Sequence, residues 1–179
     1  ICAWGGFASV KHVTKYIQPG IELISLDPKR SASIVGPEAL ESEEAMVDVG
    51  RRIAADFATG NQVACSASRL VYVMCGTDDE AVDKLKQLGR KTYEAMLALP
   101  DVISTKPKRY DPDLKRQVDA LRLSDDWYTV IGGQDNEGAV LVSHTSDRVE
   151  FWEYLADRTI NIIPVDTLEE VLDVVDAYT

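Results

Sequence analysis

The chain has 179 residues, of which 45% are hydrophobic and 27% are charged, an ordinary balance for a globular domain. Its formal net charge of −11 argues against binding to the phosphate backbone of nucleic acids as a main activity. No apolar stretch approaches the roughly 20 residues that a membrane-spanning helix needs, so we expect no membrane span.

The amino-terminal segment is expected to form a strand, a helix and a second strand. Ile1 to Trp4 reads as a short strand that ends at Gly5-Gly6. A helix is predicted over about 8–17, because apolar residues recur on one face, and Pro19-Gly20 terminates it. Ile21 to Leu26 then reads as a strand. Because the chain begins inside a strand and without Met, we expect it to be a piece of a longer polypeptide.

A strand, a long helix and a buried strand follow. Ser31 to Val35 is the first strand, and Gly36-Pro37 opens a helix that runs to about Ala58, since Pro is tolerated in a first helical turn. Leu70 to Met74 is apolar and rich in β-forming residues, which predicts a buried strand. The tight connection between this helix and this strand contains Cys65.

The rest of the chain continues with helices and strands. Thr77 is expected to be the N-cap of the next helix, with Glu80 reaching back in a capping box, and Thr167 with Glu170 repeats this pattern before the last helix. Two strands flank GGQDNEG, which suits a hairpin with a flexible tip. We predict helices over about 78–99, 111–123 and 168–178, and strands over 127–131, 139–142 and 160–165. This alternation favours a layered α/β domain.

Cys65 is the residue whose surroundings most suggest nucleophilic chemistry. A thiolate attacks carbonyl groups well, and the small polar run Ser66-Ala67-Ser68 would leave the thiol accessible and offer main-chain N–H groups to an oxyanion. A lone cysteine is more often a small buried hydrophobe, so both interpretations stay open here. The three cysteines show no CxxC spacing, so we expect neither a disulfide framework nor a metal site, and a reducing cytoplasm is the simplest compartment.

The segment GNQVACSASRLVYV resembles the active-cysteine segment of the aldehyde dehydrogenase superfamily, particularly of its acylating members. In that pattern an Asn precedes the nucleophile by four positions, which places these two residues on Asn61 and Cys65. AWGG (Ala3 to Gly6) resembles the turn that lies beside the nicotinamide in these enzymes. Two further segments are similar to family landmarks and occur in the same order, LISLDPKRSASIVGPEA at the crossover between domains and IIPVDTLEEVLDVVDAY near the family's end.

Within this superfamily, AWGG, DPKRS and DRTINIIPVD look most like the long-chain acyl-thioester (acyl-CoA or acyl-protein) reductase family. This family is the reductase component of the bacterial luminescence fatty acid reductase complex, which supplies aldehyde to luciferase. The resemblance implies that the chain is the C-terminal portion of such a protein. Residues 1–35 would be a remnant of a Rossmann-like cofactor domain with the crossover, and residues 36–179 a three-layer αβα catalytic domain of aldehyde dehydrogenase type.

The chain departs from the hydrolytic aldehyde dehydrogenases in two places. Their water-activating Glu lies in a Glu-Leu-Gly-Gly motif, whereas the corresponding residues here are Ser25-Leu26-Asp27-Pro28. The missing Glu fits a reductase, whose acyl-enzyme must meet a hydride rather than water. Counting from Gln62 as in the hydrolytic enzymes would place the nucleophile on Ala64, and only the acylating pattern reaches Cys65.

The resemblance implies NADPH-dependent reduction of long-chain fatty acyl thioesters to fatty aldehydes. Cys65 would attack the acyl-CoA or acyl-protein thioester, and a hydride from NADPH would convert the acyl-enzyme into a hemithioacetal that releases the aldehyde. The backbone N–H of Cys65 and the amide of Asn61 would stabilise the oxyanion, and Trp4, Gly5 and Gly6 would bind the cofactor. His144 is a further candidate proton donor, against the simpler expectation of a hydrogen bond at a strand end.

Protein partners are also implied by the resemblance, namely an acyl-protein synthetase and an acyltransferase, and we expect an oligomer. Two alternatives remain open. One is another aldehyde dehydrogenase, which oxidises aldehydes or reduces a shorter acyl-CoA; the other is a non-catalytic fragment or assembly domain in which the cysteine is incidental. Because most of the cofactor domain would lie upstream of Ile1, the isolated chain is expected to be inactive.

Overall fold

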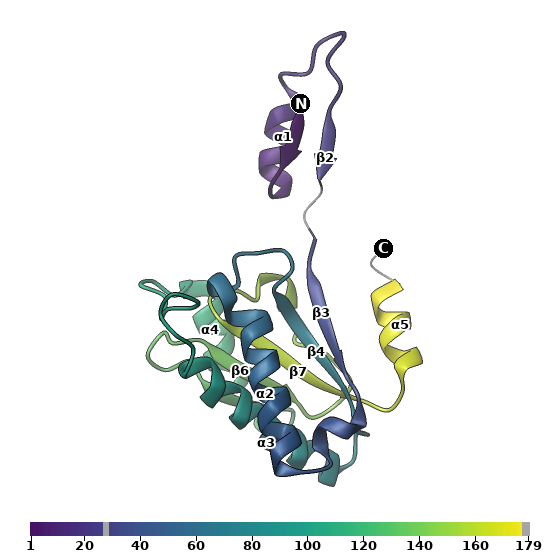
Figure 1. The fold of residues 1–179 in the computed structure, drawn as a ribbon, viewed down its shortest axis with the longest axis vertical. Coiled ribbons are helices and arrows are strands. Elements are labelled where there is room, and N and C mark those ends of the chain that lie inside the picture. Colours follow the sequence, from purple (N-terminus) through teal and green to yellow (C-terminus); the bar gives the residue numbers. More distant parts are fainter. Residues whose placement is uncertain (27–28, 177–179) are drawn as a thin grey trace. The chain divides into compact units, whose positions relative to one another are not determined.

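The computed structural model describes residues 1–26 and 29–176, and the chain divides into two compact units, Ile1–Arg30 and Ser31–Thr179. Each unit is described by itself (Figure 1). No helix in the described residues has both the length and the apolar character that crossing a membrane requires.

The first unit is a strand–helix–strand motif, as the sequence predicts. Strand β1 (Cys2–Trp4) is followed by helix α1 (Phe7–Thr14) and strand β2 (Ile24–Leu26). The two strands pair in parallel, with Cys2 opposite Ile24. Ala3 is the buried residue of these strands, and the other strand residues are exposed. Strand β2 begins at Ile24 rather than at Ile21, because Ile21 N is bonded to Gln18 O at 2.9 Å in the turn at Pro19-Gly20 and residues 21–23 are irregular.

The second unit contains a five-stranded sheet with the strand order β3-β4-β7-β6-β5. The strands are β3 (Ser31–Val35), β4 (Ser68–Met74), β5 (Tyr128–Gly132), β6 (Ala139–Ser143) and β7 (Thr159–Val165). Neighbouring strands are parallel except for β5, which forms the predicted antiparallel hairpin with β6. Strand β7 is buried along its whole length, as expected for a central strand covered on both faces.

Helices cover both faces of this sheet, which confirms the three-layer α/β fold. Helices α2 (Glu43–Ala58) and α3 (Asp79–Leu97) lie side by side on one face (Figure 1). Helices α4 (Pro112–Leu121) and α5 (Leu168–Asp176) belong to the apolar core on the other face. The side chains of β4 alternate between the two cores, with Val71 facing α2 and α3 and Tyr72 facing the opposite layer.

The structure corrects two predicted helix starts. The long helix expected from Gly36-Pro37 is split into a 3₁₀ turn (Pro37–Leu40) and α2, because the Ser42 side chain accepts a hydrogen bond from Ala45 N at 3.1 Å and caps a new helix. The N-cap of α3 is Asp78 rather than Thr77, since Asp78 Oδ1 accepts the bond from Ala81 N at 2.9 Å. Before α5, Thr167 accepts from Glu170 N at 3.2 Å, as predicted, but the Glu170 side chain accepts from Asp166 N at 3.1 Å rather than from Thr167 N.

The boundary between the compact units falls between Arg30 and Ser31. The sequence groups Ser31 to Val35 with the cofactor domain and crossover, whereas in the structure these residues form β3 and pair with β4. Asp27 and Pro28, which stand where hydrolytic relatives have part of their Glu motif, lie outside the described residues, as does Tyr178.

Candidate functional site

The backbone turn before Cys65 is formed by three consecutive residues in the left-handed region. Helix α2 ends at Ala58, and Gly60, Asn61 and Gln62 have φ angles of 60°, 56° and 64°. Glycine and asparagine adopt this region readily, whereas a glutamine there is uncommon. The turn reverses the chain so that it can enter β4 after a short loop. We call residues 63–67 the nucleophile loop, because its central residue is Cys65, the candidate nucleophile.

Gln62 holds this loop at its base. Its side chain is buried, with an exposed fraction of 2%. Nε2 donates to the carbonyl oxygens of Ser68 at 3.0 Å and Thr159 at 2.9 Å, and Oε1 accepts from Thr159 N at 3.0 Å. The sequence prediction used Gln62 only as a counting marker and missed this role. No local signal could reveal it, because Thr159 is 97 positions away.

Cys65 itself is an exposed free thiol on the surface of its unit. Its carbonyl oxygen accepts a hydrogen bond of 2.8 Å from Ser31 Oγ on β3, and Ala67 N donates to Ala64 O at 3.1 Å within the loop. The interpretation of Cys65 as a buried space-filling residue is therefore wrong. The main chain around the thiol is held by neighbouring elements while the side chain stays accessible.

Asn61, the predicted oxyanion donor, binds the segment that follows α3. Its Oδ1 accepts from Thr105 N at 2.8 Å and from Ser104 Oγ at 3.0 Å, and its Nδ2 donates to Thr105 Oγ1 at 3.2 Å. These bonds hold the 104–105 segment beside the turn. Because an amide nitrogen carries two hydrogens, one Nδ2 hydrogen can still be offered to a substrate, and the oxyanion role stays a prediction.

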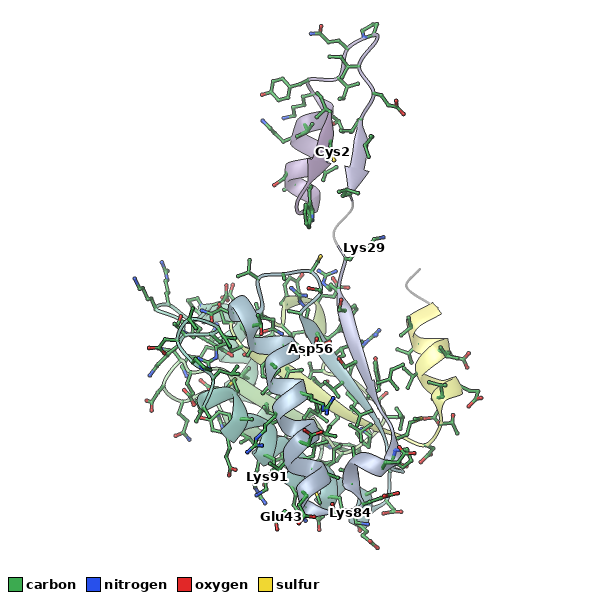
Figure 2. The ribbon with its side chains drawn as sticks, in the orientation of Figure 1. Cys2, Lys29, Glu43, Asp56, Lys84 and Lys91 are labelled. Atoms are coloured by element: carbon green, nitrogen blue, oxygen red, sulfur yellow. The ribbon has the colours of Figure 1, made fainter. Side chains whose placement is uncertain are left out.

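A polar network links β3, β4 and α2 near the loop. Ser33 Oγ donates to Asp56 Oδ2 at 2.8 Å and lies 2.7 Å from Ser68 Oγ (Figure 2 labels Asp56). Together with the Ser31 contact, this network fixes the edge strand β3 to the start of β4. The candidate site thus lies at the amino ends of β3, β4 and β7, whereas ligands of open α/β sheets usually bind at the carboxyl ends.

The start of β7 is fixed by three consecutive residues. Asp157 accepts a hydrogen bond from Asp111 N at 3.0 Å, and Arg158 Nη2 donates to Met96 O at 2.7 Å. The Thr159 hydroxyl pairs with the Tyr110 hydroxyl, and burial raises the pKa of Tyr110 to about 12, so this phenol stays protonated at neutral pH. The partner of Gln62 is therefore itself rigidly placed.

His144 and the cofactor candidates lie elsewhere. His144 follows the carboxyl end of β6, whereas Cys65 lies at the amino ends of the parallel strands. The ring nitrogens of His144 lie 2.9 Å from Thr129 Oγ1 and from Asp126 O. This agrees with the simpler structural expectation for His144. Trp4, Gly5 and Gly6 lie in the first unit, where Gly6 is the N-cap of α1 and Trp4 is 77% exposed. Their relation to Cys65 stays a prediction.

The carboxyl ends of β4 and β7 carry a different set of groups. Burial, together with the charges of Asp78 and Asp166, raises the pKa of the Cys75 thiol to about 11. Among the described residues, no group of three or more His, Cys, Asp or Glu side chains is arranged to hold a metal ion. Of the two thiols that flank β4, Cys65 is exposed and Cys75 is partly buried.

Comparison with models of protein families shows to which family this chain belongs. The model of the family described as Acyl-CoA reductase (LuxC) matches residues 1–178. The chain belongs to the acyl-CoA reductase (LuxC) family. No curated protein sequence matches the chain significantly.

Solved aldehyde dehydrogenases share the fold of this LuxC family member. It is similar to the aldehyde dehydrogenase KauB from Pseudomonas aeruginosa, with a TM-score of 0.59 at 13% identity over 92% of this chain and 35% of that one. An NAD-dependent benzaldehyde dehydrogenase from Corynebacterium glutamicum gives a TM-score of 0.58 at 15% identity, over 99% of this chain and 38% of that one.

A third similar structure is the NADP-dependent glyceraldehyde-3-phosphate dehydrogenase from Bacillus halodurans C-125 complexed with NADP. Its TM-score is 0.58 at 15% identity, over 97% of this chain and 36% of that one. The LuxC family chain thus spans little more than a third of the length of these structures. The likeness confirms the predicted aldehyde dehydrogenase type of fold.

Proposed function

We propose that this chain is the thiol-bearing part of a reductase that converts long-chain fatty acyl thioesters into fatty aldehydes, with Cys65 as the covalent nucleophile. The observation that carries the proposal is an exposed Cys65 on a loop held by three strands, in a member of the acyl-CoA reductase family. By the resemblance, the aldehyde serves bacterial luminescence, and an acyl-protein synthetase and an acyltransferase are the partners.

Cys65 takes part in two steps of this reaction. Its sulfur bonds to the thioester carbonyl carbon, the bond from that carbon to the CoA or carrier sulfur breaks, and the departing thiolate takes up a proton. After reduction, the hemithioacetal on Cys65 collapses, the carbon–sulfur bond breaks, and the aldehyde leaves. In both steps the backbone N–H of Cys65 and the amide of Asn61 are the proposed donors to the oxyanion.

The first unit fits part of a dinucleotide site. Trp4 and Gly5 lie at the carboxyl end of β1, and Gly6 precedes α1 with an extended backbone (φ −68°, ψ 163°). No acidic residue occupies the first turn of α1, so this helix end does not repel a phosphate. The chemistry that bound NADPH supplies is a hydride, which reduces the acyl group on Cys65 to the oxidation level of an aldehyde.

Exposed apolar side chains border the nucleophile loop and support an acyl chain as substrate. Val63 is 86% exposed and Val102 is 93% exposed. The hydrogen bond of 2.9 Å from Gly60 N to Ile103 O places the 102–103 segment beside the turn that leads to Cys65. An acyl chain laid over these side chains would remove apolar surface from water, which favours longer substrates by about 0.8 kcal/mol for each buried methylene.

The proposal is tested by locating the acyl group. The full-length protein is incubated with tetradecanoyl-CoA without NADPH, and the mass of each cysteine-containing peptide is measured. We expect the acyl mass on the Cys65 peptide, its loss in Cys65→Ala, and its persistence in Cys2→Ala, which removes another exposed cysteine. An acyl group on other residues but not on Cys65 would support a non-catalytic role for this cysteine.

Chain length is tested by turnover. NADPH oxidation is followed with tetradecanoyl, octanoyl and acetyl thioesters at matched concentrations. We expect the highest kcat/KM with the tetradecanoyl thioester. Equal or higher values with the short thioesters would instead assign the protein to the short-chain acylating dehydrogenases.

A further inference from the structure

Gln62 ties the two ends of the nucleophile loop to each other. The loop begins directly after Gln62 and ends directly before Ser68, whose carbonyl oxygen accepts the bond from Gln62 Nε2 at 3.0 Å. The loop is therefore closed into a ring by one side chain. The two further bonds, both to the backbone of Thr159, attach this ring to β7.

The chemistry of these bonds requires a carboxamide. The carbonyls of Ser68 and Thr159 accept from the two hydrogens of Nε2, and the Thr159 N–H, which also donates to Ala156 O at 3.0 Å, donates to Oε1. Two donor hydrogens and an acceptor oxygen are the inventory of a neutral amide group. An apolar side chain of the same length would leave these buried backbone groups without this partner, which costs more than an ordinary surface hydrogen bond. Gln62 holds this position although its φ of 64° is uncommon for glutamine.

The ring has a direct consequence for Cys65, which lies at its centre. The loop contains no helix or strand, so its geometry depends on its ends, on the turn bond from Ala67 N to Ala64 O at 3.1 Å, and on the contact from Ser31 Oγ to Cys65 O. Removing the closure at Gln62 lets both ends move independently. A displacement of about 1 Å at a reacting atom is enough to lower a rate by up to about a hundredfold.

We propose that Gln62 is the positioning residue of the nucleophile, which acts through the loop backbone and not through contact with substrate. This inference rests on the proposed function of Cys65. It predicts that loss of the Gln62 carboxamide lowers the rate of acyl transfer to Cys65 while the thiol stays accessible to small reagents.

Asn161 provides a matched control for a purely structural role. It is a second fully buried carboxamide, on β7, and it accepts from Val149 N at 2.9 Å and donates to Leu141 O at 3.1 Å and Ser143 Oγ at 3.0 Å. Its removal disturbs the same sheet as the removal of Gln62. None of these hydrogen bonds of Asn161 involves a residue of the nucleophile loop.

The experiment compares Gln62→Met with Asn161→Leu in the full-length protein. Four quantities are measured, namely kcat and KM with tetradecanoyl-CoA and NADPH, the single-turnover rate of Cys65 acylation by mass spectrometry, and the rate of Cys65 alkylation by iodoacetamide. Far-UV circular dichroism and the midpoint of thermal unfolding establish that each variant is folded at the assay temperature. Gln62→Asn and Asn161→Ser repeat the comparison with milder changes if an apolar variant does not fold.

For Gln62→Met we expect kcat and the acylation rate to fall roughly tenfold to hundredfold, with KM and the alkylation rate within about threefold of wild type. For Asn161→Leu we expect kcat, KM, the acylation rate and the alkylation rate all within about threefold of wild type. The inference is overturned if Gln62→Met acylates like wild type, or if Asn161→Leu loses as much acylation. Failure of the proposed function itself gives a different pattern, in which wild-type protein carries no acyl group on Cys65 or Cys65→Ala still turns over.

Discussion

Two serines allow effects on stability and on the proposed activity to be tested separately. Ser42 caps α2, so Ser42→Ala should lower the free energy of unfolding by about 1 kcal/mol and leave kcat unchanged. Ser31 binds the carbonyl oxygen of Cys65, so Ser31→Ala should lower kcat several-fold with at most about 0.5 kcal/mol lost in stability. Urea unfolding and NADPH oxidation measure the two effects, and the reverse pattern would contradict the role given to Ser31.

The thiol of Cys75 should make the stability of the folded protein depend on pH. Burial and the nearby carboxylates raise the pKa of Cys75 from 9.0 to about 11. Because the folded state holds this proton more tightly than the unfolded state, the associated stability is complete below pH 9 and is lost as the pH rises toward 11. We expect Cys75→Ala to flatten the decline of the unfolding midpoint between pH 9 and 11.

The same pKa separates the cysteines in labelling. At pH 8, iodoacetamide should modify Cys65 and Cys2, which are exposed, and leave Cys75 unmodified in the folded protein. Peptide mass spectrometry checks this, with unfolded protein in urea as the control in which all three react. Fast labelling of Cys75 in the folded state would contradict the burial that raises its pKa.

At the scale of single residues, the sequence predicts the candidate nucleophile but not what holds it. The prediction of Cys65 rests on the resemblance of its local segment to the active-cysteine segment of the superfamily. Ser31 and Gln62 act through contacts 34 and 97 positions away, so no local spacing indicates them. Asn61 was predicted as an oxyanion donor, and the structure adds its bonds to Ser104 and Thr105.

Among the elements, α2 and α3 pack closely against each other at Gly50. A Cβ added there would lie 3.0 Å from Thr92 N and 3.1 Å from the Lys91 carbonyl carbon, both of which belong to the backbone of α3. Alanine normally stabilises a helix interior by about 1 kcal/mol relative to glycine. We expect the opposite sign here, with Gly50→Ala destabilising by about 1 to 3 kcal/mol because the helices must separate.

Urea unfolding measures this effect, and Arg51→Ala provides a control at the neighbouring exposed position of α2. The control should change the free energy of unfolding by no more than about 0.5 kcal/mol. A stabilised Gly50→Ala protein would contradict the close approach of α2 and α3. Because α2 leads directly into the turn before Cys65, its placement also matters for the site.

The kinds and order of the elements were predictable, and their ends were less so. Apolar runs and alternation identified β4, β7 and the β5–β6 hairpin, since these strands are buried in a two-faced core. The prediction of one continuous helix from Gly36-Pro37 was wrong. Ser42 caps a new helix, α2, and this cap decides the boundary although the apolar periodicity begins before it. Competing caps decide such boundaries, and at α3 Asp78 competes with Thr77 for the same role.

For the whole molecule, the division into two units predicts that acyl transfer to Cys65 can be separated from the oxidation of NADPH. Both apolar cores of the sheet lie within residues 31–179, so this part should fold alone. Under the proposed function it should accept an acyl group on Cys65 but should not oxidise NADPH, because the proposed cofactor contacts at Trp4, Gly5 and Gly6 are absent. Circular dichroism, peptide mass spectrometry and absorbance at 340 nm measure these three properties, with the full-length protein as the control. NADPH oxidation by residues 31–179 would contradict the cofactor assignment.

The place of β7 between β4 and β6 has a consequence for synthesis on the ribosome. Strand β4 leaves the exit tunnel long before β7, so the edge of β4 that pairs with β7 stays unpaired until β7 has also been translated. During this interval the thiol is already made but its surroundings are unfinished. The bonds between Gln62 and Thr159 form only when β7 has joined the sheet, so a chain that stops before Thr159 carries Cys65 without this anchor.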